Sequence, residues 1–130
     1  MKKLLMLGLV LFAGLTLACS QKKGYLANGL FKKPSYLTEN CGSLYTAFRN
    51  NIPASKNMKY VEVYIVSPGK YTEAGLYLQK SIESKGYFQV QSQKVGDTGY
   101  VFGYSNVSKV ITLSVTRLGD TVVAIVGGNN

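Results

Sequence analysis

The second half of the chain is a succession of short alternating segments, and this pattern constrains the fold more than any other feature of the sequence. Apolar and polar residues alternate with period two, and turns containing Gly, Asn, Asp or Ser separate the segments. Such alternation, with many β-branched and aromatic residues, is typical of strands. Strands that follow one another through short turns pair as an antiparallel meander. We therefore predict four such strands, over residues 87–95, 100–104, 107–118 and 121–126.

An earlier segment, residues 59–66, alternates in the same way and is predicted to be a fifth strand. Val61, Val63 and Ile65 would lie on one face of this strand. The opposite face would carry Tyr60, Glu62, Tyr64 and Val66. The last strand, residues 121–126, is apolar on both faces, so we expect it to be central or covered.

Two helices are predicted. The more regular one spans residues 69–85, with Ser67 as its N-cap and Gly86 just beyond its end. Its apolar stripe at helical spacing consists of Tyr71, Ala74, Leu78 and Ile82. The second helix is predicted in the middle of residues 34–53, with Leu37 and Cys41 on its apolar face.

This order of elements predicts an α+β fold. We expect a two-layer sandwich, in which an antiparallel sheet of about five strands carries one or two helices on one face. A single domain would span residues 36–127, and residues 128–130 would form a short tail.

The first 18 residues have the plan of a secretory signal peptide. Lys2 and Lys3 form a positive start, an apolar run without charge follows over residues 4–17, and Ala18 is a small residue. The apolar run is shorter than the roughly 20 residues that a transmembrane helix needs. We therefore predict that residues 1–18 are a signal peptide.

The end of this leader, LTLAC at residues 15–19, resembles the bacterial lipobox. Thr16 stands where the lipobox usually has Leu. The resemblance implies that Cys19 is acylated and becomes the first residue of a bacterial lipoprotein, held in the cell envelope by its lipid. Ser20 stands where an Asp would favour the inner membrane, so by analogy we expect the outer membrane, facing the periplasm.

Residues 19–35 are predicted to be a tether between the lipid and the domain. Four lysines in this segment could contact the membrane surface, or the segment could be a solvated linker. They are Lys22, Lys23, Lys32 and Lys33. The chain has a net charge of +9, of which the leader contributes two, leaving +7. This charge favours anionic partners, and export argues against nucleic acid.

The chain has two cysteines. If Cys19 carries the lipid, Cys41 has no partner within the chain. We therefore expect Cys41 to be a buried small apolar residue, or a free thiol that can react or pair with another chain.

No arrangement of residues in the sequence indicates catalysis. Histidine is absent, which removes the usual general base and the commonest metal ligand. The six acidic residues are scattered, and Glu62, in mid-strand, is expected to be exposed. We predict no enzyme activity, no metal and no cofactor.

Aromatic residues on two predicted strands suggest a binding surface. They would form a patch on the sheet face away from the helices, because tyrosine is favoured at protein interfaces. The alternative is that these rings pack against the tether or the first helix. The residues are Tyr60, Tyr64, Tyr100, Phe102 and Tyr104.

Residues 76–90, with LYLQKSI followed by KGYFQV, are similar to the helix and strand unit of periplasmic envelope-assembly domains of the curli-secretion lipoprotein and TolB amino-terminal type. The lipobox, the absence of a catalytic set and the aromatic face together predict a non-enzymatic, lipid-anchored envelope protein that binds another envelope protein through this face. The alternatives are a module that binds anionic cell-wall or lipid material, and an inhibitor or immunity protein displayed on the envelope.

Overall fold

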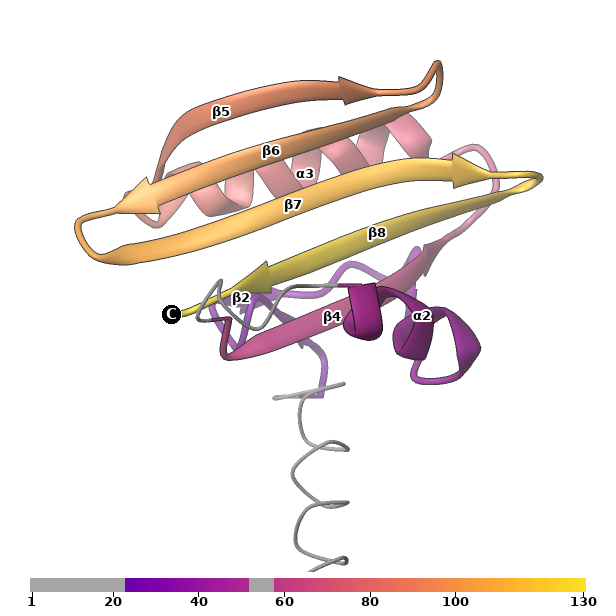
Figure 1. Cartoon of the computed structure of the whole chain (residues 1–130), viewed down its shortest axis with the longest axis horizontal. Helices are drawn as coiled ribbons and strands as arrows, with labels where there is room; N and C mark the ends of the chain where they lie inside the picture. The colour runs from indigo at the N-terminus through magenta and orange to yellow at the C-terminus, as the bar shows by residue number, and fades with distance from the viewer. Residues whose placement is uncertain (1–22, 52–57) are drawn as a thin grey trace, which may run out of the picture.

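The computed structural model describes residues 23–51 and 58–130, and its centre is one six-stranded antiparallel sheet (Figure 1). The order of strands across the sheet is β3-β4-β8-β7-β6-β5. The bounds are β3 Leu37–Glu39, β4 Tyr60–Val66, β5 Phe88–Val95, β6 Gly99–Asn106, β7 Lys109–Leu118 and β8 Thr121–Gly128. Two helices, α2 (Ser43–Asn51) and α3 (Tyr71–Ser84), complete the α+β fold that the sequence predicts.

The meander of the last four strands is confirmed, and each neighbouring pair in it is antiparallel. The strand β8 lies between β4 and β7, which confirms its expected central position. The turn between β6 and β7 falls at Val107 and Ser108, two residues later than the predicted turn at residues 105–106. The sheet therefore has two ends, one with the β6–β7 turn and one with the β5–β6 and β7–β8 turns (Figure 1).

Helix α3 packs on one face of the sheet through its predicted stripe. Ala74, Leu78 and Ile82 are fully buried in the main core. The helix ends as predicted, because Gly86 adopts a left-handed φ of 89° and the next residue, Tyr87, is buried. Its start differs, since the N-cap residue is Lys70 and makes no side-chain cap, whereas Ser67 was expected.

The sheet face that α3 covers is not the one that the sequence suggested. Tyr60, Glu62 and Tyr64 of β4 point into the core under α3, together with Tyr104 of β6. Val61 and Val63 lie on the opposite face, where they pack against Tyr45 of α2. Figure 1 shows the two helices on opposite sides of the sheet, so one helix, not two, covers the main face.

The predicted first helix is shorter and later than expected. Leu37 belongs to β3, where it pairs with Val66 of β4. The apolar residues that were predicted to form one helix therefore belong partly to the short strand β3 and partly to α2. Their spacing alone could not show where the strand ends and the helix begins. The strand β3 is the sixth strand of the sheet.

Residues 23–35, predicted to be part of a tether, are packed on the domain. They contain a small antiparallel sheet of β1 (Tyr25–Leu26) and β2 (Phe31–Lys32). Leu26 and Ala27 are fully buried in the main core. The tether prediction is therefore wrong for this part, because these apolar side chains cover the edge of the core beside α3.

Candidate pocket between the helix and the sheet

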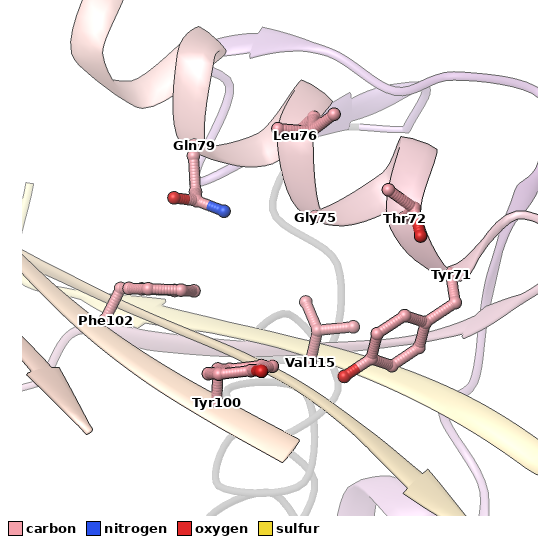
Figure 2. A pocket seen from close by; sticks show the side chains of 8 residues that line it. All are labelled: Tyr71, Thr72, Gly75, Leu76, Gln79, Tyr100, Phe102 and Val115. Atoms are coloured by element: carbon pink, nitrogen blue, oxygen red, sulfur yellow. The ribbon is translucent and has the colours of Figure 1, made fainter. Parts of the chain in front are cut away.

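A pocket of about 320 Å³ opens between α3 and the strands β6 and β7 (Figure 2). Its walls are mostly apolar, and its polar groups come from a few side chains. The lining residues are Tyr71, Thr72, Gly75, Leu76, Gln79, Tyr100, Phe102 and Val115. Concave apolar sites with a few polar groups are the usual form of a ligand or partner site.

The helix wall is formed by the flank of α3 beside its buried stripe. Gly75 lacks a side chain at the centre of this flank, and a Cβ built there would have its nearest neighbour, Gln79 Nε2, at 4.0 Å. The missing side chain therefore leaves open space between the helix and the sheet.

The sheet wall is aromatic. The rings of Tyr100 and Phe102 are stacked, with centroids 6.1 Å apart and an interplanar angle of 10°. Val115 of β7 pairs with Tyr100 and completes the floor. Figure 2 shows the amide of Gln79 extending from α3 toward Phe102, where it offers a donor and an acceptor between apolar walls.

One end of the pocket is closed by Tyr71, whose ring reaches from the start of α3 toward the strands (Figure 2). Its hydroxyl donates to the carbonyl oxygen of Thr98 at 3.0 Å. The guanidinium of Arg117 lies 5.9 Å from the ring centroid. Burial raises the pKa of Tyr71, as does Tyr100 to a smaller degree, while Arg117 lowers it. The hydroxyl is therefore neutral at physiological pH.

Two basic side chains, Lys94 and Arg117, lie on the strand side of the pocket. Lys94 of β5 pairs with Tyr100 across the strands, so the two side chains share the pocket face of the sheet. Lys94 and Arg117 are both exposed. An apolar group with a nearby negative charge would therefore match this site better than a neutral one.

Only part of the predicted aromatic surface exists. Tyr60, Tyr64 and Tyr104 are at most 2 % exposed, so their assignment to an exposed patch is wrong. The reason is that α3 and the β1–β2 segment cover the face that these residues share. Burial raises the pKa of Tyr60 and of Tyr64, and it raises that of Tyr104 to about 12. Tyr100 and Phe102 remain accessible and belong to the pocket.

Glu62 is buried, with 1 % exposed, whereas the sequence predicted an exposed residue. Its carboxylate accepts hydrogen bonds from the backbone N–H of Ala27 at 2.7 Å and of Asn28 at 3.0 Å. The hydroxyl of Tyr64 donates to it at 3.1 Å. Burial raises the pKa of Glu62, and these hydrogen bonds lower it. The carboxylate therefore fastens the β1–β2 segment to β4.

The predicted membrane-contact lysines have different environments. Lys23 and Lys32 are exposed. Lys33 is half-buried, and its ammonium donates to the carbonyl oxygens of Leu37 and Pro34. Lys22 lies outside the residues that the structure describes.

The cysteine predictions have separate outcomes. Cys41 is exposed and disulfide-bonded, so neither a buried apolar residue nor a free thiol describes it. Cys19 lies outside the described part of the chain, as do the residues of the predicted signal peptide, so lipidation of Cys19 stays a prediction.

Within residues 23–51 and 58–130, no group of three or more His, Cys, Asp or Glu side chains is placed to hold a metal ion. No helix in this part of the chain is long and apolar enough to cross a membrane. No protein family model, curated protein or solved structure matches the chain.

Proposed function

We propose that this chain is a lipid-anchored protein of the bacterial cell envelope whose domain is a non-catalytic binding module. Its site is the pocket between α3, β6 and β7, and its partner is another envelope protein. The partner would insert an apolar or aromatic side chain that is flanked by an acidic residue. The observation that carries this proposal is an accessible aromatic wall in a concave apolar site with two basic side chains on its strand side.

The pocket supports this assignment better than a flat surface would. Binding energy in protein interfaces concentrates where a side chain fills a desolvated pocket. Gly75 and the stacked rings of Tyr100 and Phe102 create such a pocket, and Gln79 supplies one polar contact inside it.

The leader supports the location. A lipid on Cys19 and a disulfide to Cys19 would use the same sulfur atom. In the lipidated protein, Cys41 could form a disulfide only with a cysteine of another chain, because the sequence has two cysteines. An envelope partner with its own cysteine would satisfy this requirement, because disulfides persist in the periplasm.

The test is photocrosslinking in the native host, with p-benzoylphenylalanine in place of Tyr100 of the full chain. We expect a discrete protein adduct. Gly75→Leu fills the pocket without a backbone clash, because no atom beyond Gln79 Nε2 lies within 4 Å of the added Cβ. It should reduce the adduct about tenfold or more.

Gly75→Ala is the matched control, since it adds only one methyl group at the same position and should keep most of the adduct. An adduct of equal yield in the Gly75→Leu and Gly75→Ala variants would contradict the assignment of the pocket as the binding site.

A further inference from the structure

The end of the sheet that carries the β6–β7 turn combines exposed apolar side chains with basic ones. Val107 is 97 % exposed at the turn and Phe88, at the start of β5, is 75 % exposed. Val110, at the start of β7, is also exposed. Phe88 and Val110 both pair with Ser105 of β6, so they lie in one row on the same face of the sheet.

Three lysines lie at the same end. Lys59 precedes β4, Lys85 follows α3, and Lys109 begins β7. Figure 1 shows the starts of β4, β5 and β7 together with the end of α3 at this side of the molecule. The contact that a Cβ on Gly86 would make with Asn106 Nδ2, at 3.4 Å, places the end of α3 against the β6–β7 turn.

The side chains at the end with the β6–β7 turn carry a net positive charge. Its three lysines lie near one exposed carboxylate, Glu83, in the last turn of α3.

The conformation of Val107 is unusual for its residue type. Its φ is 55°, in the left-handed region that β-branched residues rarely adopt. Asn129 holds the start of β7 beside this turn, because its side chain accepts from the N–H of Val110 at 2.7 Å and donates to the carbonyl oxygen of Ser108 at 3.3 Å. A strained apolar residue is thus presented to solvent on a fixed turn, and no packing in the domain explains it.

We propose that this end of the sheet, with Val107 at its tip, docks on an anionic lipid bilayer. The apolar side chains would enter the interface between headgroups and acyl chains, and the lysines would contact the negative headgroups. A soluble acidic polymer would engage the lysines and leave Val107 and Phe88 in water, so the bilayer is the partner that uses both features. This inference is independent of the pocket.

The experiment uses the absence of tryptophan from the chain. A single reporter, Val107→Trp, is introduced into the full chain, and Leu118→Trp serves as the control at the opposite end of β7. Both proteins are added to vesicles of phosphatidylglycerol or of phosphatidylcholine, with brominated acyl chains as quenchers. A lipid anchor or leader segment contributes equally to the vesicle binding of both variants. The difference in quenching between them therefore reports how close the β6–β7 turn lies to the bilayer.

We expect a blue shift and at least about twofold stronger quenching for Val107→Trp than for Leu118→Trp, in phosphatidylglycerol only. Combining Lys85→Gln with Lys109→Gln should reduce the difference in quenching between the two reporters. Equal quenching at the two positions, or in the two lipids, would overturn the proposal. So would a Val107→Trp blue shift of equal size with soluble polyglutamate. Ser108→Trp is a second reporter on the same turn, and it carries the test if Val107→Trp does not fold.

Discussion

Replacing Glu62 with Ala should strongly destabilise the domain, because this carboxylate satisfies three donors at the junction of β4 with the β1–β2 segment. The buried Ala27 N–H would be left without its acceptor, whereas the Tyr64 hydroxyl keeps the carbonyl oxygen of Tyr25, at 3.4 Å, as an acceptor. Each buried donor that loses its partner costs about 1–3 kcal/mol. The Asn28 N–H is only partly buried and can bond to water.

Part of this loss is offset, since the substitution also removes the desolvation of the carboxylate that raises its pKa. We therefore expect a decrease of about 1–3 kcal/mol in the free energy of unfolding. This is a large fraction of the 5–15 kcal/mol that is typical of a small domain. Denaturation by urea, followed by circular dichroism, measures the change.

The control is Glu83→Ala, which removes an exposed carboxylate and should change the stability by less than about 0.5 kcal/mol. Hydrogen exchange should show that residues 25–32 open first in the Glu62→Ala variant. A loss below about 1 kcal/mol, with unchanged exchange in this segment, would refute the role assigned to the carboxylate.

Three further predictions concern stability. The pKa of Glu62 is raised above its ordinary value of 4.5 in the folded state, so stability relative to Glu62→Gln should be greatest below pH 4.5 and fall as the pH rises through the folded pKa. Urea denaturation at several pH values checks this, and a difference that grows with pH would contradict it. Gly75→Ala should raise the free energy of unfolding by about 0.5–1 kcal/mol, because it adds helix propensity and the Cβ meets no clash; a lower melting temperature would show that the pocket cannot accept a methyl group. Val107→Asn should raise the free energy of unfolding by about 1 kcal/mol, since Asn tolerates the left-handed conformation, and Ser108→Ala on the same turn is the control for a general effect of substitution.

Period-two alternation was sufficient to predict β4 to β8, the meander and the central place of β8, because these depend on local pattern and short turns. Alternation also separated the two faces of β4 correctly. It could not tell which face α3 covers, since valine and tyrosine are both compatible with burial. The tyrosines of β4 were therefore placed on the wrong side.

The burial of Glu62 and the pocket at Gly75 both depend on contacts between segments that lie far apart in the sequence. Glu62 becomes buried because the β1–β2 segment, far away in sequence, supplies its donors. The N–H groups of Ala27 and Asn28 point to one carboxylate because both residues have left-handed φ values, near 55–58°. The pocket arises from a missing side chain at Gly75, whose effect depends on how α3 crosses the sheet.

Lipidation of Cys19, which would hold the chain in the envelope, is tested most directly by mass spectrometry of the protein purified from its host membranes without reduction. We expect an N-terminal peptide that begins at Cys19 and carries acyl chains. A peptide of residue 19 joined by a disulfide to Cys41, without acyl chains, would contradict it.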